Sequence, residues 1–377
     1  MNKQKICVIG DGLTGLTVAL FLSKLKIDVC IVGKFKKKIS FQDGRTTAIS
    51  PSNYDFFLNL INKKSSKAFF PSKQIDLFYQ EGKYQHHFMN LKDNNKNLMY
   101  TIQNNKLKKI IFDQIKKNKN IKIINDEVNK IDEKNSKVFL RKKAISCDCI
   151  LLCVGRNSKL VKNIMGNRVI ENDFKEVAFT TIVKHNLKIP NARQYFFEEG
   201  PLAILPINER EFSLVWSVDK NYALDRMENL IRSRLNKILM PNKKLVFKQI
   251  DFYPIFFKYN VNFLNKNALV LGEGSYSIHP VAGQGFNLIL RDIRELGREI
   301  EKHLSIGMQI KDSSILRDFV VTRKPEKLFF GLGINFIHEF FKNNKISVPI
   351  KKIILKDINK FSLLKKVSIN LSNKGIF

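Results

Sequence analysis

Short apolar runs alternate with glycine-containing turns over the first part of the chain. Residues 5–9 (KICVI) predict a buried strand, residues 10–15 (GDGLTG) a turn, residues 16–25 a helix and residues 28–32 (DVCIV) a second strand. An apolar strand followed by a glycine turn, a helix and another apolar strand is typical of a βαβ unit. The pattern therefore predicts an α/β fold that begins at the N-terminus.

The hydrophobic pattern changes twice further along the chain. Residues 175–258 alternate between polar and apolar positions and are rich in aromatic residues, with one helical insert near 222–238, which predicts an antiparallel sheet and a second subdomain. Residues 268–272 (ALVLG) return to the pattern of a buried parallel strand, and the chain from 284 onward is predicted to be helical. The first part is expected to contain further helices and strands at 51–62, 106–118, 121–124, 128–131, 136–140 and 149–154.

Composition and charge narrow the class of protein. The chain has 377 residues, 44% of them hydrophobic and 30 of them Phe, which is enough to build a large core and argues against disorder. The formal net charge of +32 suggests an anionic partner, either nucleic acid or a membrane surface. Basic runs lie at 34–38, 106–109 and 351–356 and form no single stripe with interleaved aromatics, so nucleic acid is not predicted as a partner.

The cysteines and the N-terminus suggest a reducing compartment. Cys7, Cys30, Cys147, Cys149 and Cys153 lie in or beside predicted strands, where buried free thiols are expected. No metal site is predicted, because the cluster at 147–153 has no neighbouring His. No signal peptide is expected, and the apolar run 329–341 is too short to cross a membrane.

The segment GDGLTG has the spacing of a dinucleotide-binding motif. Gly10 is expected to make the tight turn, Gly12 to let a pyrophosphate approach the backbone, and Gly15 to allow close packing of helix and strand. The start of the following helix then offers free N–H groups and a partial positive charge to the phosphates.

One residue of this motif is missing. The acidic residue that holds the ribose usually follows the second strand, about 20 residues after the glycines. Gly33 occupies that place and Lys34 follows it, whereas Asp28 lies at the entrance of the strand. Either another group holds the ribose, or nucleotide binding is weakened.

A second glycine-rich segment, HPVAGQGFNL at 279–288, precedes a predicted helix. The apolar spacing of Phe286, Leu290 and Ile293 along residues 286–304 indicates that one face of this helix is anchored in the core. Such a segment is either an ordinary tight turn or a place where a ligand lies almost on the backbone.

Four segments together resemble a known family: GDGLTG at 10–15, DGRTTAIS at 43–50, GPLAILPINEREFSLVW at 200–216, and residues 272–292. They are similar to flavin-dependent aromatic hydroxylases, in particular the ubiquinone-biosynthesis monooxygenase family. The resemblance implies a doubly wound, Rossmann-like FAD-binding domain interleaved with an antiparallel-sheet substrate domain, and a helical C-terminus. The implied boundaries are 1–70, 100–165 and 262–305 for the FAD-binding domain, 71–99 and 166–261 for the substrate domain, and 306–377 for the helical region.

The resemblance also implies which residues contact FAD. They comprise the first glycine turn with its neighbouring leucine, an arginine on the phosphate side, the glycine and acid near the ribityl chain, and the loop beside the isoalloxazine ring. These residues are Gly10, Gly12, Leu13, Gly15, Arg45, Gly272, Glu273, Pro280, Gly283, Gln284, Gly285, Phe286 and Asn287. A glycine-rich helix start at this loop would place N–H groups near the negative charge of reduced flavin.

Family members use NAD(P)H as a transient co-substrate and O2 to form a flavin hydroperoxide, which hydroxylates an aromatic ring. The implied reaction is ring hydroxylation of a polyprenylated ubiquinone precursor, carried out peripherally on the inner face of the cytoplasmic membrane, with a quinone-biosynthesis complex as a possible partner. The chain departs from the family where it reads CVGRNSKLVK (153–162), because Val154 replaces an aspartate and Val161 an arginine. These changes leave two alternatives open: a related epoxidase or reductase acting on an isoprenoid, or a degenerate accessory protein that binds flavin or lipid.

The histidines and the C-terminus add weaker hypotheses. His279 precedes Pro280 and is a catalytic candidate, although the family's chemistry does not require a protein base; His185, His303 and His338 are solitary, and a surface or satisfied role is expected for each. Residues 350–367 have apolar residues at helical spacing among lysines. This segment either packs on the body of the protein or lies on an anionic membrane.

Overall fold

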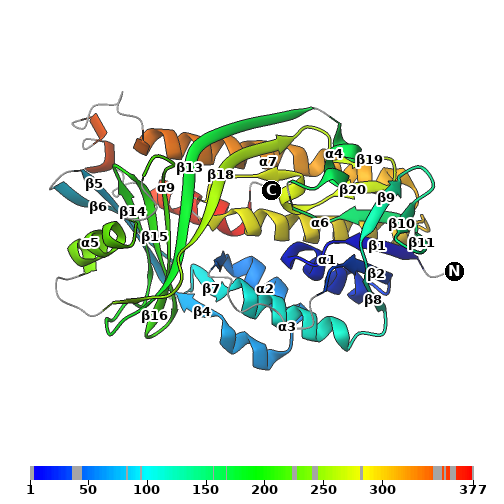
Figure 1. Cartoon of the computed structure of the whole chain (residues 1–377), viewed down its shortest axis with the longest axis horizontal. Helices are drawn as coiled ribbons and strands as arrows, with labels where there is room; N and C mark the ends of the chain where they lie inside the picture. Colours follow the sequence, from blue (N-terminus) through cyan, green and yellow to red (C-terminus); the bar gives the residue numbers. More distant parts are fainter. Residues whose placement is uncertain are drawn as a thin grey trace.

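The structure of this chain is a computed structural model. Figure 1 shows a sheet flanked by helices at one end, a large curved sheet at the other, and a long helix, α7 (Ser313–Lys342), running along both. The predicted fold class, an α/β domain interleaved with an antiparallel sheet and followed by helices, is confirmed. The structure describes residues 4–35, 45–81, 84–93, 96–155, 157–166, 168–222, 227–239, 245–280, 283–342, 350–351, 354–356 and 362–375.

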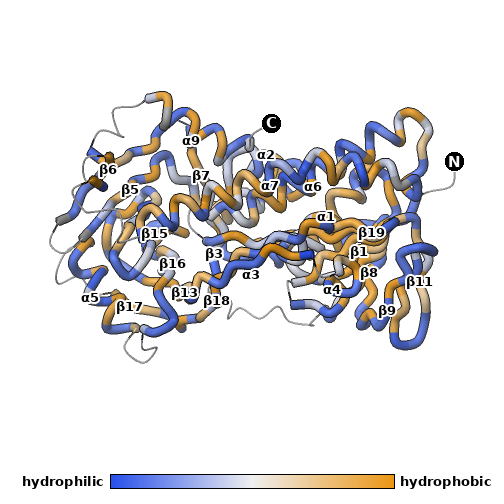
Figure 2. The backbone as a smooth tube through the Cα atoms, turned by 90° about the horizontal axis from the view of Figure 1, so that it is seen from above, coloured by the Kyte–Doolittle hydropathy of each residue, from blue (hydrophilic) through white to orange (hydrophobic). Residues whose placement is uncertain are grey.

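The first sheet has six strands and carries the predicted βαβ unit. Its strands pair in parallel except at one edge, where two short strands pair antiparallel, and their apolar residues are buried on both faces. Figure 2 colours these strands largely as hydrophobic. In spatial order the strands are β19 (Leu264–Asn265), β20 (Ala268–Val270), β12 (Cys149–Leu152), β1 (Lys5–Ile9), β2 (Asp28–Gly33) and β8 (Ile121–Asn125).

Helices pack closely against this sheet and against one another. The helix after β1 begins at Leu13, three residues before the predicted start, because Gly12 serves as its N-cap. A Cβ atom on Gly297 would lie 2.2 Å from the ring of Phe21, so only glycine allows helices α1 and α6 to approach this closely. The helices outside the C-terminal region are α1 (Leu13–Lys24), α2 (Pro51–Leu60), α3 (Asn104–Lys116), α4 (Lys159–Met165), α5 (Met227–Leu239) and α6 (Gly285–Ser305), with 3₁₀ turns η1 (Lys63–Ala68) and η3 (Gly272–Gly274).

The second sheet has nine strands and is antiparallel except for one parallel pair, β14 with β5. Its core contains Trp216, the one tryptophan of the sequence, whose indole N–H donates a 3.1 Å hydrogen bond to the Gly200 carbonyl. The strands in spatial order are β21 (Tyr276–Ser277), β18 (Asp251–Asn260), β13 (Val169–Lys184), β16 (Glu211–Asp219), β15 (Gly200–Asn208), β14 (Ala192–Phe197), β5 (Gln74–Glu81) and β6 (Tyr84–Lys92), with β17 (Val246–Phe247) beside β13.

A β-bulge interrupts β13. The pairing of β13 with β18 shifts register between Asp173 and Glu176, and Lys175 within the bulge has a φ of +53°. Bulges redirect side chains, and a positive φ is uncommon for a residue other than glycine. As a result the Glu176 side chain is buried, whereas Lys175 is exposed.

The remaining strands form two small three-stranded sheets. One contacts β15 of the large sheet, and the other packs its buried apolar residues into the core of the six-stranded sheet. The first contains β3 (Thr46–Ile49), β7 (Met99–Gln103) and β4 (Phe70–Ser72); the second contains β11 (Ala144–Ser146), β10 (Lys137–Leu140) and β9 (Val128–Asp132).

The C-terminal region is helical, as predicted. Helix α7 packs on α6 through buried charged residues: Asp292 of α6 lies 2.7 Å from Arg323 and 3.0 Å from Lys327 of α7. Helix α9 (Ser362–Lys374) follows, whereas much of the predicted helix at 350–367, namely 352–353 and 357–361, lies outside the described residues. Among the helices described, none is both long and apolar enough to cross a bilayer.

Candidate functional site

The GDGLTG turn has three glycines with different surroundings. Gly10 has a φ of +126°, and a Cβ atom there would lie 2.3 Å from the carbonyl oxygen of Cys153. A Cβ atom on Gly15 would lie 2.0 Å from the Gly10 carbonyl oxygen, so neither position tolerates a side chain. A Cβ atom on Gly12 would meet nothing within 4 Å, and the backbone there is open to a close ligand.

The start of α1 suits an anion. Gly12 is its N-cap, and no side chain caps the first N–H groups of the helix, which begins at Leu13. Uncapped N–H groups and the positive end of the helix dipole favour a phosphate. The surroundings of Gly10, Gly12 and Gly15 therefore fit the phosphate-binding turn that the sequence predicts.

The segment at Gly272 and Glu273 lies beside this turn. Gly272 has a φ of +80°, and a Cβ atom there would lie 3.0 Å from the Thr14 hydroxyl oxygen. Glu273 lies in η3 and is exposed. Two of the predicted motifs, 260 residues apart in the chain, thus meet at the carboxyl edge of the parallel sheet, where α/β folds bind ligands.

The loop before α6 is held against β3 by one buried amide. The Asn287 side chain donates 2.9 Å and 3.2 Å hydrogen bonds to the carbonyls of Ala48 and Gly283 and accepts a 2.9 Å hydrogen bond from the Ser50 N–H. Gly283 has a φ of +61°, and a Cβ atom there would lie 3.2 Å from that of Ala48. Asn287, a predicted cofactor residue, therefore uses its side chain to position the loop.

The remaining loop residues form the start of α6. The helix begins at Gly285, one residue earlier than predicted, and Gln284 is its N-cap without a side-chain cap hydrogen bond. Phe286 packs on the ring of Phe57, with centroids 6.4 Å apart, and Pro280 is half-buried. A second uncapped helix N-terminus is therefore present in the site.

Arg45 connects this region to the large sheet. Its guanidinium lies 5.0 Å from the ring centroid of Tyr253 on β18, within the range of a cation–π contact. Arg45 immediately precedes β3, which is part of the small sheet that the Asn287 loop contacts. The predicted phosphate-side arginine thus lies against an aromatic ring of the nine-stranded sheet.

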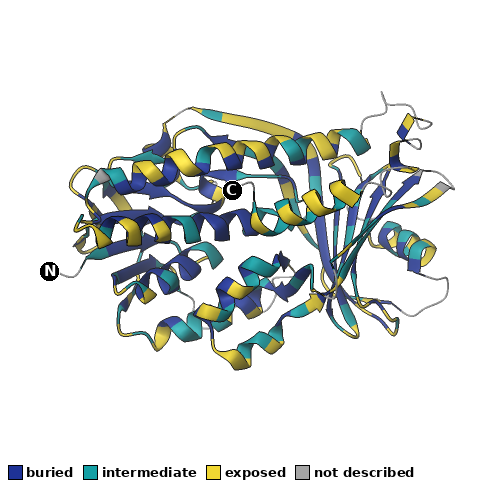
Figure 3. Cartoon of the chain, turned by 180° about the vertical axis from the view of Figure 1, so that it is seen from behind, coloured by how far each residue is buried: buried dark blue, intermediate teal, exposed yellow. Residues whose placement is uncertain are grey.

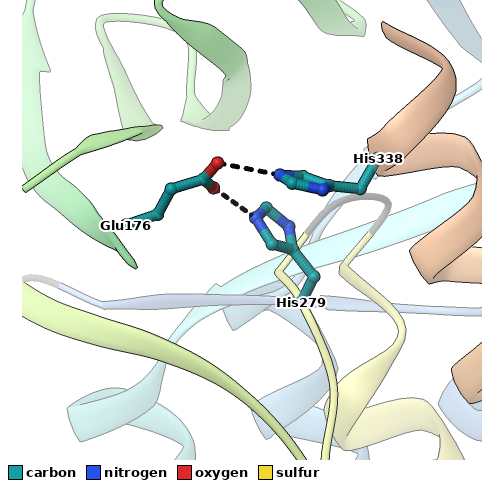
Figure 4. A group of neighbouring side chains, drawn as sticks. All are labelled: Glu176, His279 and His338. Carbon is teal, nitrogen blue, oxygen red and sulfur yellow. Dashed lines mark hydrogen bonds and ion pairs between the residues drawn. The ribbon is translucent and has the colours of Figure 1, made fainter. Parts of the chain in front are cut away.

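His279, at the start of the loop, belongs to a buried cluster that the sequence did not reveal. Glu176 Oε2 lies 2.8 Å from His279 Nε2, and Glu176 Oε1 lies 2.9 Å from His338 Nε2, as drawn in Figure 4. The Lys342 ammonium also hydrogen-bonds Glu176 Oε1. The bulge of β13, the loop and the end of α7 therefore meet at one carboxylate, which we call the Glu176 cluster.

The pKa of Glu176 indicates that its carboxylate is ionised in this cluster. Burial raises the pKa of Glu176, but hydrogen bonds from His279, His338 and Lys342 outweigh burial, so the net pKa lies well below the ordinary value. Burial lowers the pKa of His279, partly offset by Glu176. An ionised carboxylate only accepts hydrogen bonds, so each imidazole carries its hydrogen on Nε2.

The same three side chains could approach a metal ion. One ligand atom from each of Glu176, His279 and His338 lies within 4.8 Å of the others, and carboxylate with two imidazoles suits several divalent ions. Lys342 places a positive charge on the same carboxylate and competes with a cation. Without a metal, the four side chains already form a hydrogen-bonded ion pair network.

The 153–162 segment explains one departure from the family pattern. Val161 is buried, and a Cβ atom on Gly274 would lie 3.1 Å from the Val161 side chain and 3.1 Å from the Val154 carbonyl oxygen. An arginine at 161 would have to fit into this apolar contact. The position has become part of the core rather than of a ligand surface.

Sequence reasoning missed Glu176, His338 and Lys342. The first is 103 residues from His279 and 162 residues from His338, so no local pattern joins them. The expectation that His338 is solitary was wrong: it is buried, its ring centroid lies 4.4 Å from that of His279, and its Nε2 hydrogen-bonds Glu176 of the β13 bulge. The bulge that redirects Glu176 contains Lys175 at a positive φ, and no residue pattern in the sequence predicts it.

The chain resembles known proteins along most of its length. A protein-family model described as an FAD binding domain matches residues 3–308. The ubiquinone biosynthesis monooxygenase COQ6 of Dictyostelium discoideum is 24% identical over 98% of this chain and 91% of that protein, and the ubiquinone hydroxylase UbiM of Neisseria meningitidis is 22% identical over 96% and 83%.

Solved structures of low sequence identity share the fold. The p-nitrophenol 4-monooxygenase PnpA of Pseudomonas putida has a TM-score of 0.80 at 16% identity and covers 97% of this chain and 96% of its own. HpxO of Klebsiella pneumoniae, solved with FAD and uric acid, has a TM-score of 0.72 at 13% identity and covers 98% of this chain and 97% of its own.

Proposed function

The chain belongs to the FAD binding domain family of flavoprotein monooxygenases, and from this premise we propose that it hydroxylates the aromatic ring of a polyprenylated ubiquinone precursor. The observation that carries the proposal is similarity to ubiquinone hydroxylases over nearly the whole chain, including both sheets. The overall reaction combines the phenol, O2, NAD(P)H and a proton to give the hydroxylated ring, water and NAD(P)⁺. One oxygen atom enters the ring and the other leaves as water.

The residues of the site fit FAD. The open backbone at Gly12 and the uncapped start of α1 would hold the pyrophosphate, and the loop at Gly283–Gly285 would lie against the isoalloxazine ring. Bound FAD supplies the redox chemistry, taking electrons from NAD(P)H and activating O2. The chain's own contribution is to hold the loop in place through Asn287 and the Glu176 cluster and to exclude water from it.

An oxygen-labelling experiment tests this reaction. Purified protein reconstituted with FAD is given NAD(P)H and a phenol that carries one short isoprenoid chain, under an atmosphere of labelled O2. The expected product contains one labelled oxygen atom on the ring, and NAD(P)H oxidation is faster with the phenol than without it. Oxidation of NAD(P)H without any labelled product would contradict hydroxylation.

A second candidate is favoured by the altered 153–162 segment. If Val161 and Val154 have removed the contacts for the pyridine nucleotide, the protein is an accessory flavoprotein of quinone biosynthesis. Deleting the gene tests whether the protein takes part in quinone biosynthesis at all. Accumulation of an unhydroxylated precursor supports the enzyme. Rescue of the quinone pool by a variant that no longer oxidises NAD(P)H would support the accessory role.

The substrate class bears on the exposed face of α7. Between Val321 and Ile337 this helix exposes Val321, Leu328, Phe329, Leu332 and Phe336, with Val321 and Phe336 each 71% exposed. Their spacing places them on one side of the helix over about 24 Å. Figure 3 shows that exposed positions recur along α7. We call this surface the α7 stripe.

We propose that the α7 stripe docks on an anionic lipid bilayer. No acidic side chain is exposed between Val321 and Ile337, and the chain carries a net charge of +32, which attracts it to anionic lipid. A polyprenyl tail resides in the bilayer, so a membrane contact brings the site to its substrate. A small pocket lined by Phe196, Phe197, Gly200, Pro201, His338, Phe341 and Lys342 adjoins the inner side of the same helix.

Vesicle binding tests the docking surface. Replacing Leu332→Asp and Phe336→Asp together is expected to weaken binding to vesicles containing anionic lipid at least about tenfold, because burial of each side chain contributes about 1.5–3 kcal/mol. Phe139→Asp, at an exposed aromatic on the separate β9–β11 sheet, is the matched control and should bind like the unmodified protein. Equal binding by all three proteins would overturn the lipid contact, as would wild-type protein that ignores vesicles and instead forms dimers through α7.

A further inference from the structure

The acidic residue that usually binds the ribose in the dinucleotide motif is absent at the end of β2. A neighbouring residue lies close to the place that its side chain would take. Gly33 ends β2, where a carboxylate normally holds the ribose of the adenosine. A Cβ atom on Gly33 would lie 2.8 Å from the Cβ atom of Asp11 and 3.1 Å from the Asp11 backbone nitrogen. The side chain that fills the position next to the end of β2 is therefore that of Asp11.

Asp11 is fixed in this position by the turn itself. It stands between Gly10 and Gly12, and the Gly10 N–H donates a 2.8 Å hydrogen bond to the Val32 carbonyl, which ties the turn to the last residues of β2. The close contact requires glycine at 33, because a larger residue would collide with Asp11. The residue beside the end of β2 is thus itself an acid, and it lies close to the place where the motif usually has one.

We propose that Asp11 binds the ribose hydroxyls of FAD in place of an acid at position 33. A carboxylate has two oxygens and accepts hydrogen bonds from two adjacent hydroxyls. Lys108 Nζ lies 3.9 Å from Asp11 Oδ2, beyond hydrogen-bonding distance, and both side chains are about one-third exposed, so the carboxylate keeps its capacity to accept.

Neighbouring polar groups at this edge are engaged elsewhere. The Asn125 side-chain oxygen accepts a 3.0 Å hydrogen bond from the Phe35 N–H, and Asp126 Oδ1 accepts a 2.7 Å hydrogen bond from the Glu127 N–H. Asp28 lies at the opposite end of β2. Among the described acids near Gly33, Asp11 is the one whose atoms lie nearest to the place of the missing side chain.

FAD titration of the apoprotein tests this role and needs no turnover. Asp11→Asn is expected to weaken FAD binding about tenfold or more, since a hydrogen bond to a charged group contributes about 1.5–3 kcal/mol. Lys108→Met keeps the carboxylate and should bind FAD as the unmodified protein does. Asp113→Asn, a surface acid paired with Lys116 on α3, is the matched control for loss of one charge.

Competition with nucleotides identifies the ribose. The unmodified protein is expected to prefer ADP over 2′,3′-dideoxy-ADP about tenfold, and Asp11→Asn should bind the two equally. Equal weakening of both nucleotides by Asp11→Asn would overturn ribose binding, as would a variant that binds FAD with unchanged affinity. The melting temperature of each variant is measured alongside, to exclude unfolding.

A position exchange completes the test. Asp11→Gly weakens FAD binding, and adding Gly33→Glu should restore it to within about threefold of the unmodified protein, because the acid then stands at its usual place. Gly33→Glu alone should not bind FAD well, since its side chain meets Asp11. The inference rests on the FAD part of the proposed function: an unmodified protein that binds no FAD would overturn both, whereas unchanged binding by Asp11→Asn overturns this inference only.

Discussion

Helices α3 and α7 distribute their side chains in opposite ways. On α3, Leu107, Ile111 and Ile115 are buried while lysines face the solvent, as in an ordinary amphipathic helix. On α7, Arg323 and Lys327 are among the buried residues, whereas Leu332 and Phe336 are exposed. The difference reflects what each helix packs against.

The comparison teaches that α7 meets two unusual environments. Its inner side buries charges that are stable only because they are paired, as Arg323 and Lys327 are with Asp292, and Lys327 also lies 3.9 Å from the ring centroid of Phe263. Its outer side exposes apolar area that water disfavours. This distribution of buried charges and exposed apolar side chains is the basis of the proposal that the α7 stripe docks on a bilayer.

The largest loss of stability is expected from removing the buried ion pairs between α7 and α6. Asp292→Ala removes the ion-pair partner of the buried Lys327 and one of the two carboxylates that pair with Arg323, the other being Glu326. It should lower the free energy of unfolding by about 3–5 kcal/mol, measured by urea denaturation. Lys116→Ala on α3 removes an exposed pair with Asp113 and should change it by less than about 1 kcal/mol. Similar small losses in both variants would mean that the α7 charges are not buried in solution.

Removing one apolar side chain from each helix should give unequal results. Ile111→Ala on α3 deletes a fully buried side chain and is expected to cost about 2–5 kcal/mol. Leu332→Ala on α7 is expected to stay within about 0.5 kcal/mol, because that side chain is 59% exposed in the monomer. Thermal unfolding of both variants without lipid provides the measurement, and a large loss for Leu332→Ala would contradict an outward-facing stripe.

The smallest effect concerns the Glu176 cluster at the end of α7. The lowered pKa of Glu176 gives a stabilisation that is present above the unfolded-state pKa of about 4.3 and is lost as pH falls below it. The lowered pKa of His279 adds a stabilisation present above about pH 6.5 and lost as pH falls through its folded-state pKa. Stability should therefore decline in two stages as pH falls, first below about pH 6.5 through His279 and then below about pH 4.3 through Glu176.

Glu176→Gln separates the two contributions. It should cost about 1–3 kcal/mol at pH 7 and flatten the decline below about pH 4.3, because the carboxylate is gone. The carboxamide can accept from one imidazole but must donate to the other, so nitrogen NMR should show one histidine with its hydrogen moved to Nδ1. Glu171→Gln, an exposed position on the same strand, is the control. An unchanged pH profile in Glu176→Gln would contradict the assignment.

The parts of the molecule that the sequence predicts are those with local signals. The strand–turn–helix–strand unit at 5–33 follows from its apolar runs and glycines, because neighbouring residues determine these elements. Gly10 and Gly15 were also readable, since a Cβ atom at either position would collide with the backbone, whereas Gly12 leaves the backbone open to a ligand. The family and FAD were predicted from those motifs and are confirmed.

What could not be predicted depends on distant contacts. Glu176 reaches His279 and His338 only because a bulge redirects it, and no periodicity encodes that bulge. The exposed face of α7 contains apolar residues that sequence patterns assign to a core, so its orientation follows only from the charged partners on α6. The contact of Asp11 with Gly33 is likewise invisible without the spatial pairing of β1 and β2.

Trp216 can serve as a fluorescent probe of the large sheet. It is the one indole in the chain, fully buried and hydrogen-bonded to Gly200, which also lines the small pocket beside α7. Its ultraviolet emission therefore reports on the nine-stranded sheet, while the visible absorbance of a bound flavin would report on the region around the glycine turns. A single sample can follow both regions separately during binding of a ring-bearing compound or of vesicles.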